Sequence, residues 1–369
     1  MSGRKIIAWL CFPITMWYAI VVIIRNIAFA TGILKQEVPK VTTIGVGNLT
    51  TGGSGKTPHV EHLLEILGRE HKSALLSRGY RRKTKGYVLA TPKQRDAQHI
   101  GDEPAMIKQK FPHVEVAVCE KRVLGVNKLI KKDPQIKLIV MDDVYQHRYI
   151  KPTINILLTE YHRPYCSDSI LPFGNLREFK SGRDRAGIIV VTKSPKVINP
   201  IERYNLTSAL KIYPYQKVYF SYYEYGNLVS LHDRSERSLK EVSEAVVVTG
   251  IAHPEPLLEH VNESGCKVTH MRYNDHHNYS QGDYKKIAQA LKQAGEGAVV
   301  ITTEKDTAKI KEALGSEELA NIPIYYIPIK VCFHNNNEHS FDETIQDLVR
   351  ENISFLEKLK TSSLLSYQY

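Results

Sequence analysis

A glycine-rich segment between a predicted strand and a predicted helix constrains the fold of this chain more than any other feature. The segment reads GNLTTGGSGKTP at 47–58, after the β-branched run 41–47 and before the amphipathic run 59–70. In such a loop, backbone N–H groups surround phosphate oxygens at the N-terminus of the helix. Lys56 would reach the outer phosphates of a nucleotide, and the Thr57 hydroxyl would bind Mg²⁺. The segment therefore predicts a phosphate-binding loop on an α/β sheet.

The loop departs from the strict Gly-x-x-x-x-Gly-Lys-[Ser/Thr] pattern at its first position, where Thr50 replaces glycine. A generic glycine-rich turn is the alternative, but the order of strand, Gly-Lys-Thr and helix favours a nucleotide site. The sequence contains no Asn-Lys-x-Asp, so a GTPase is disfavoured. The residues expected to contact the nucleotide are Thr50, Thr51, Gly52, Gly53, Ser54, Gly55, Lys56 and Thr57.

Short β-branched runs alternate with amphipathic stretches through the first half of the chain. Nearly continuous apolar strands that alternate with helices predict a parallel sheet covered on both faces. The fold class expected here is therefore α/β, with a P-loop NTPase-like parallel sheet. The predicted strands are 41–47, 73–79, 114–119, 136–142, 154–160 and 187–193.

The pattern changes near residue 214, where the tyrosine-rich run 217–231 resembles a β-hairpin turning at Gly226-Asn227. Strand and helix patterns then resume, with strands expected at 245–250, 267–273, 298–306 and 322–331. A smaller second α/β domain follows from this pattern. We expect an N-terminal membrane helix at 1–31, a nucleotide-binding domain at 32–213, the hairpin and second domain at 214–360, and a tail at 361–369.

The N-terminus carries 19 consecutive uncharged residues, 6–24, flanked by Arg4, Lys5 and Arg25. As a helix this run covers about 28 Å, close to the thickness of the hydrocarbon core of a bilayer. A cleaved signal peptide is one alternative, but the run is longer than a usual signal core. A buried core helix is another, although no polar stripe is present. A membrane helix is favoured, and whether it spans the bilayer or lies along it stays open.

The chain is basic, with 50 Lys and Arg against 39 Asp and Glu and a formal net charge of +11. Such a balance favours an anionic partner: nucleic acid, phosphates or an acidic membrane surface. The basic turn 77–83 could contact an anionic substrate or a lipid headgroup, or could be a solvated face. Five scattered cysteines without a Cys-x-x-Cys pair argue against a disulfide framework or a thiolate zinc site.

Acidic residues stand where phosphoryl transfer would use them. The apolar strand 138–141 ends in Asp142 and Asp143, and an acid on a strand beside the loop holds Mg²⁺ in P-loop enzymes. Asp102 stands at a predicted helix start, where N-capping is the simpler reading. The segment 275–279, Asp-His-His-Asn-Tyr, could supply a carboxylate and imidazole pair that deprotonates a hydroxyl, or could only cap and solvate.

Taken together, these residues resemble the tetraacyldisaccharide 4'-kinases of bacterial lipid A biosynthesis. The resemblance covers most of the chain in order, and that family also has Thr at the Thr50 position. The matching motifs are V-G-N-L-T-x-G-G-S-G-K-T-P at 46–58, S-R-G-Y at 77–80, G-D-E-P at 101–104, D-D-x-Y-Q-H at 142–147, L-P-x-G-x-L-R-E at 171–178, D-H-H-N-Y at 275–279 and T-E-K-D at 303–306.

The resemblance implies a membrane-associated kinase that transfers the γ-phosphate of ATP to the 4'-hydroxyl of an acylated glucosamine disaccharide 1-phosphate. ATP and Mg²⁺ would be its cofactors, and nucleic acid is not needed to explain the charge. The residues implied as catalytic are Asp102 as base, His276 as its partner (with His277 less favoured) and Lys56. The implied metal-site residues are Thr57, Asp142, Asp143 and Glu178, and the implied substrate contacts are Arg78, Tyr80, Asn175 and Arg177.

The resemblance also implies a location at the inner membrane of a Gram-negative bacterium, with the catalytic domains on the cytoplasmic side. We expect a monomer on an anionic membrane surface. One departure stands out, because Val144 replaces a glycine that is usual in the family. If that position required a positive φ, a β-branched residue would be costly there. A smaller departure is Phe179, where the family commonly has Pro.

Overall fold

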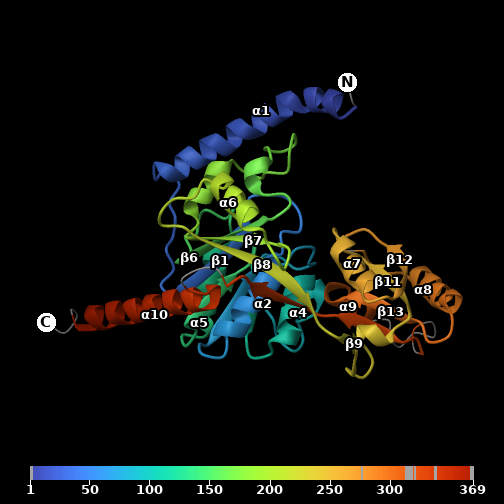
Figure 1. Cartoon of the computed structure of the whole chain (residues 1–369). Coiled ribbons are helices and arrows are strands. Elements are labelled where there is room, and N and C mark those ends of the chain that lie inside the picture. Colours follow the sequence, from blue (N-terminus) through green and yellow to red (C-terminus); the bar gives the residue numbers. More distant parts are fainter. Residues whose placement is uncertain (1–2, 276, 312–318, 320, 336–338, 366–369) are drawn as a thin grey trace. The chain divides into compact units, whose positions relative to one another are not determined.

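The computed structural model describes residues 3–275, 277–311, 319, 321–335 and 339–365. The chain divides into two compact units, each described here by itself (Figure 1). Unit 1 contains residues 1–222 and 331–369, and unit 2 contains residues 223–330. The expected pair of α/β domains is therefore present.

Unit 1 is built on a nine-stranded sheet in the order β15-β8-β7-β6-β1-β5-β2-β4-β3. The pairs β4–β2, β2–β5, β5–β1, β1–β6, β6–β7 and β7–β8 are parallel, and β3 runs antiparallel to β4. The predicted parallel sheet is thus confirmed. The strands are β1 Thr42–Asn48, β2 Ser73–Ser77, β3 Val88–Leu89, β4 Glu115–Val118, β5 Leu138–Met141, β6 Ile154–Glu160, β7 Ile188–Thr192, β8 Lys217–Tyr225 and β15 Ile329–Phe333.

Helices pack on both faces of this sheet, because successive side chains of a strand point to opposite faces. In β5, Leu138 and Val140 join the core beneath α2 and α10, whereas Ile139 and Met141 join the core beneath α5. Every residue of β5 is therefore buried, which explains its unbroken apolar sequence. The helices of unit 1 are α1 Gly3–Ala30, α2 Lys56–Leu67, α3 Ala97–Ile100, α4 Asp102–Lys110, α5 Arg122–Lys132, α6 Pro200–Ala209 and α10 Phe341–Leu365.

Unit 2 has a six-stranded sheet in the order β10-β9-β14-β13-β11-β12. Strands β12, β11, β13 and β14 pair in parallel, and β9 runs antiparallel to β14 and β10. Its strands are β9 Leu228–Ser230, β10 Glu236–Arg237, β11 Glu244–Thr249, β12 Lys267–Arg272, β13 Val299–Thr303 and β14 Ile324–Ile327. Its helices are α7 Glu255–Glu263, α8 Gln281–Ala294 and α9 Glu304–Lys311.

The predicted β-hairpin is wrong. Strand β8 pairs in parallel with β7, whereas β9 pairs with β14 and β10 in the other sheet. Gly226-Asn227 does separate two strands, as expected. However, β8 lies between β7 and β15 in the sheet of unit 1 and does not pair with β9. The predicted strand 322–331 is likewise two strands, because Pro328 separates β14 from β15 and has no N–H to donate.

The limits of the domains also differ from those expected. The units divide after residues 222 and 330, within β8 and β15, so the segment 331–360 belongs to unit 1 and not to the second domain. Helix α10 explains this, because Phe341, Ile345 and Val349 lie in the core of unit 1 with α2 and β1. The helix also continues through Leu365, so the expected tail begins later than residue 361.

The N-terminal apolar run forms α1, and its segment Pro13–Ala30 is long and apolar enough to cross a membrane. Within this segment only Phe29 is buried, and the other residues are exposed or half-buried. Its exposed apolar residues include Trp17, Ile24 and Ile27. A buried core helix, one of the alternatives, is therefore excluded for this segment.

Candidate functional site

The glycine-rich loop joins β1 to α2, as predicted, and its glycines adopt the conformations that such a turn requires. Gly52 and Gly55 have φ values of 106° and 81°, which favour glycine, and Gly55 is the N-cap of α2. Lys56 is the first residue of the helix. Its Nζ lies 3.6 Å from Oδ1 of Asp143 and 3.5 Å from the side-chain oxygen of Asn48. The ammonium of Lys56 thus lies between the end of β1 and the residues that follow β5.

One side of the loop pairs with the segment 171–178. The N–H of Thr51 donates to the carbonyl of Asn175 at 2.7 Å, and the N–H of Arg177 donates to the carbonyl of Leu49 at 2.7 Å. Between them, Thr50 and Leu176 form an antiparallel bridge. Thr50 therefore has extended, strand-like pairing, and this accounts for a β-branched residue where the strict pattern has glycine.

The other side of the loop is held from the end of β7 by residues that the sequence interpretation missed. The hydroxyl of Thr192 donates to the carbonyl of Ser54 at 3.0 Å, and the ammonium of Lys193 donates to the carbonyl of Gly53. Lys193 also lies 2.6 Å from the carboxylate of Glu160. The signal was available, since Thr-Lys follows a parallel strand and such strand ends meet at one edge of the sheet.

Two aspartates follow β5 and have different surroundings. Asp142 is 5% exposed, and its Oδ1 is buried without a hydrogen-bond partner. Burial raises the pKa of Asp142, and the negative charges of Glu103 and Asp143 raise it further. Burial would also raise the pKa of Asp143, but Lys56 and Arg177 outweigh it and lower that pKa. Arg177 Nη1 lies 3.2 Å from Oδ1 of Asp143.

The side chains around the loop can be compared with the ligands that Mg²⁺ requires. Among the described residues, no group of three or more His, Cys, Asp and Glu side chains is placed to hold a metal. Mg²⁺ needs fewer protein ligands, because one or two carboxylates and nucleotide phosphates complete its shell with water. The unpartnered oxygen of Asp142 and the hydroxyl of Thr57 on the first turn of α2 fit that requirement.

Glu178, implied as a metal-site residue, is already engaged by other side chains. It is 5% exposed, and Oε1 accepts from Arg185 at 2.8 Å and from Gln146 at 3.2 Å. Gln146 also donates to the carbonyl of Asn48 at 2.7 Å. Oε1 of Glu178 is thus bound by protein donors, and its role as a metal-site residue stays a prediction.

Asp102 begins α4, next to the S-R-G-Y turn. A side chain at Gly101 would place Cβ 2.9 Å from the carbonyl oxygen of Tyr80, and one at Gly79 would place it 2.9 Å from that of Ile100. Both glycines have positive φ, so the two backbones are in close contact. Arg78 and Tyr80 are exposed, and the backbone of their turn lies against Gly101, the residue before Asp102.

Asn175, His276 and His277 are the remaining predicted residues. The amide of Asn175 is bound to Asp168, at 3.1 Å from Nδ2 to Oδ2. His276 lies outside the described residues, so its pairing with Asp102 stays a prediction. His277, in unit 2, has Nε2 3.1 Å from Oδ2 of Asp283 and its ring stacked on Tyr273.

The Val144 departure has a local explanation. The positive φ in this turn belongs to Asp143, at 45°, and not to Val144. Val144 is 3% exposed, and a Cβ at Gly45 would lie 2.8 Å from its Cγ1. The valine therefore fills core space beside a glycine of β1, and no strained backbone is required of it.

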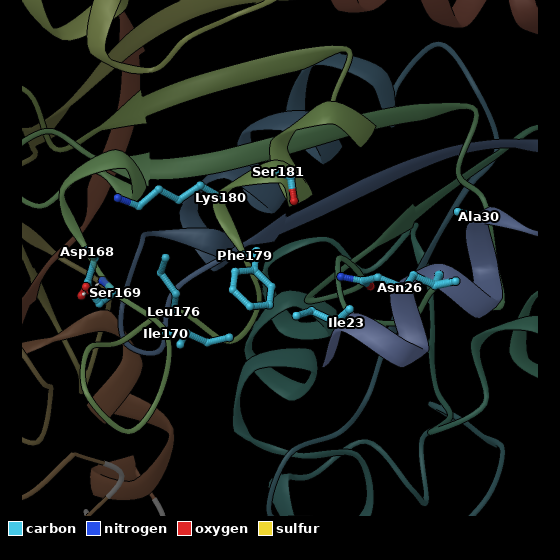
Figure 2. Close-up of a pocket in the computed structure, with 11 residues that line it drawn as sticks. Ile23, Asn26, Ala30, Asp168, Ser169, Ile170, Leu176, Phe179, Lys180 and Ser181 are labelled. Carbon is cyan, nitrogen blue, oxygen red and sulfur yellow. Dashed lines mark hydrogen bonds between the residues drawn. The ribbon is translucent and has the colours of Figure 1, made fainter. Parts of the chain in front are cut away.

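A cavity of about 810 Å³ opens between the C-terminal half of α1 and the segment 168–181. Figure 2 shows Ile23 and Asn26 of α1 on one side of it and Leu176 and Lys180 on the other. Leu176 bridges Thr50, so the cavity adjoins the back of the phosphate loop. Its lining is Ile23, Asn26, Ile27, Ala30, Asp168, Ser169, Ile170, Leu176, Phe179, Lys180 and Ser181.

Comparisons with known proteins find one family over most of the chain. The model of the family described as LpxK, Tetraacyldisaccharide-1-P 4'-kinase, matches residues 7–350. The tetraacyldisaccharide 4'-kinase of Bacteroides thetaiotaomicron is 41% identical over 94% of this chain and 94% of its own length. That of Phocaeicola vulgatus is 40% identical over 95% and 98%. A crystal structure of LpxK from Aquifex aeolicus in complex with ATP has a TM-score of 0.71 at 26% identity, covering 94% of this chain and 99% of that one.

Proposed function

This chain belongs to the tetraacyldisaccharide-1-P 4'-kinase family, and we propose that it transfers the γ-phosphate of ATP to the 4'-hydroxyl of an acylated glucosamine disaccharide 1-phosphate. The observation that carries the proposal is Lys56 at the start of α2, within 3.6 Å of Asp143 and beside the buried Asp142. A phosphate loop with carboxylates on the neighbouring strand suits phosphoryl transfer with a metal ion.

In this proposal ATP would lie across the loop from Thr50 to Thr57. Thr57 and Asp142 would hold Mg²⁺, which would neutralise part of the negative charge of the phosphates. Lys56 stabilises the negative charge that develops on the transferred group, which is where most of the rate enhancement arises. Its pairing with Asp143 fixes the position of the ammonium before ATP arrives. Lys193 and Thr192 hold the loop carbonyls of Gly53 and Ser54.

Asp102 would take the proton from the acceptor hydroxyl. Asp102→Ala should lower turnover on the order of 10²–10⁴-fold, the range for a lost general base, with little change in ATP affinity. Steady-state kinetics and nucleotide binding measured on the same preparation check this. Unchanged turnover in Asp102→Ala would remove Asp102 from the mechanism.

We propose that the acceptor glycolipid binds on the side of the phosphate loop that faces α1. Arg78, Tyr80, Asn175 and Arg177 are proposed substrate contacts. The largely apolar cavity between α1 and segment 168–181 has room for part of an acyl chain. Exposed apolar residues of α1 support contact with a membrane, and we place the chain as a monomer on the cytoplasmic side of the inner membrane of a Gram-negative bacterium.

The test follows radiolabel from γ-labelled ATP through full-length protein in mixed micelles with the extracted acceptor glycolipid. Label in the lipid phase is expected. Free labelled phosphate alone would identify a membrane-associated ATPase, and bound but unreacted ATP would identify a nucleotide-binding module. Either of these two outcomes would contradict the proposal.

A further inference from the structure

One face of α1 makes polar contacts with the rest of unit 1, although the helix is apolar overall. Tyr18 Oη donates to the carbonyl of Arg177 at 2.7 Å, and Arg25 Nη2 donates to the carbonyl of Gln146 at 2.7 Å. Two helical turns separate Tyr18 from Arg25, so both residues lie on the same face. Arg148 donates to Asn26 at 2.8 Å, which extends the same face towards the end of the helix.

The other side of the helix is exposed. Trp17 is 69% exposed and Ile24 is 62% exposed, although each adjoins a residue of the contacting face. Contact with lipid uses such apolar side chains, and basic side chains add attraction to anionic headgroups, but neither requires a bond to a carbonyl of the protein. Membrane contact therefore does not explain the two hydrogen bonds that Tyr18 and Arg25 donate to backbone carbonyls.

The two carbonyls belong to residues whose own side chains hold the phosphate site. Arg177 contacts Asp143, the partner of Lys56, and its N–H donates to Leu49 at the start of the loop. Gln146 donates to the carbonyl of Asn48, the last residue of β1. Arg177 and Gln146 are also joined to each other, at 3.2 Å from Nη1 to Oε1.

We propose that Tyr18 and Arg25 are positioning residues for the phosphate site. Each fixes the backbone of one residue, and that residue in turn fixes the end of β1 or the Asp143–Lys56 pair. This inference rests on the proposed function for its kinetic readout, but nucleotide binding tests it independently. It makes α1 part of the nucleotide site as well as a membrane-contacting helix.

The experiment compares full-length Tyr18→Phe, Arg25→Gln and the double variant with the wild type. Phe keeps the ring and removes only the donor, so one neutral hydrogen bond is lost, and about a five-fold weaker affinity for a fluorescent ATP analogue is expected. Arg25→Gln removes a charged donor and should cost about ten-fold or more. Arg25→Lys keeps a cationic donor and should recover part of the loss.

Ile24→Leu is the matched control, because it changes the exposed face and keeps its apolar character. Each variant is assayed in detergent and on vesicles of phosphatidylethanolamine and phosphatidylglycerol, with co-sedimentation and the thermal unfolding midpoint recorded. A raised KM for ATP in both media, with co-sedimentation and the midpoint kept, supports the proposal. Unchanged nucleotide affinity overturns it, and so does a loss that appears only on vesicles together with lost co-sedimentation. If the wild type binds nucleotide but labels no lipid, the proposed function fails while the affinity series still decides this inference.

Discussion

Each of the two units has a buried aspartate at the carboxyl end of its parallel sheet, and the two aspartates have opposite surroundings. In unit 1, Asp142 keeps an oxygen without a hydrogen-bond partner. In unit 2, Asp306 is 1% exposed, and its Oδ2 accepts from the N–H of Gly250 at 3.0 Å and from the hydroxyl of Thr303 at 2.7 Å.

The two carboxylates therefore have different roles: that of Asp306 stabilises the fold, and that of Asp142 is available to a ligand. Protein donors compensate the burial of Asp306, so that carboxylate contributes to stability. Burial of Asp142 raises its pKa, which means that the folded state disfavours its charge until a cation arrives. A buried polar atom without a partner is costly, and such costs are tolerated mainly at functional sites.

Among the variants that test this comparison, Asp142→Asn should have the largest effect. The substitution keeps the shape and removes a charge proposed to bind Mg²⁺, so turnover should fall by about 10²–10³-fold. Because the folded state disfavours that charge, the free energy of unfolding should stay equal or rise. Kinetics at saturating Mg-ATP and chemical denaturation provide the two readouts. A clear loss of stability would place Asp142 with the structural carboxylates and end the comparison.

For Asp306→Ala we expect the reverse, a loss of stability in unit 2. It leaves the N–H of Gly250 and the hydroxyl of Thr303 without an acceptor, at about 1–3 kcal/mol of unfolding free energy for each buried group. Asp306→Asn keeps an acceptor oxygen and should lose less. Urea denaturation of both variants measures the difference. Equal stability of Asp306→Ala and the wild type would show that the saturated carboxylate does not stabilise unit 2.

Lys193→Met should have a smaller effect on the nucleotide site of unit 1. The substitution keeps an unbranched apolar stem but removes the donor to Gly53 and the partner of Glu160. Loss of a charge-assisted hydrogen bond predicts about a ten-fold rise in the KM for ATP. Glu160→Gln is the companion variant, because it leaves Lys193 its contact with Gly53. An unchanged KM in Lys193→Met would show that the loop is positioned without it.

The smallest effect is a pH dependence that belongs to unit 1. Burial lowers the pKa of His59 to about 4, and its ring nitrogens lie 2.7 Å from the carbonyl of Gly55 and 2.8 Å from the hydroxyl of Ser221. The unfolded state takes up a proton below about pH 6.5 and the folded state does not, so stability falls as the pH decreases from 6.5 towards 4. The loss between pH 6.5 and 5.5 should be about 1 kcal/mol. His59→Asn should lack this component, and an identical pH profile in that variant would contradict the assignment.

Local sequence was sufficient for the features of unit 1 that depend on strand order. A β-branched strand, a glycine-rich turn and an amphipathic helix specify the loop, and acids that end a neighbouring strand reach the same edge. Lys56 and Asp143 are therefore both expected at this edge, and their side chains lie 3.6 Å apart. The parallel sheet followed from the same apolar, uninterrupted strands.

The features that the sequence did not reveal depend on contacts between distant segments. The partner of β8 is β7 and not the adjacent β9, because pairing across a sheet outweighs a local turn signal. Lys193 and Tyr18 each act on a backbone carbonyl, and a carbonyl carries no residue-specific signal. The positive φ at Asp143 rather than at Val144 is likewise a property of the folded turn.

The proposed reaction is a single phosphoryl transfer, from ATP to one hydroxyl of a membrane glycolipid. Phosphorus NMR of the extracted lipid, after incubation of the full-length protein with Mg-ATP and the acylated disaccharide 1-phosphate, tests it most directly. We expect a second phosphate monoester, at the 4' position of the distal sugar, with the wild-type protein and none with Asp142→Asn over the same time. A lipid that keeps only its 1-phosphate while the wild-type protein consumes ATP would contradict it.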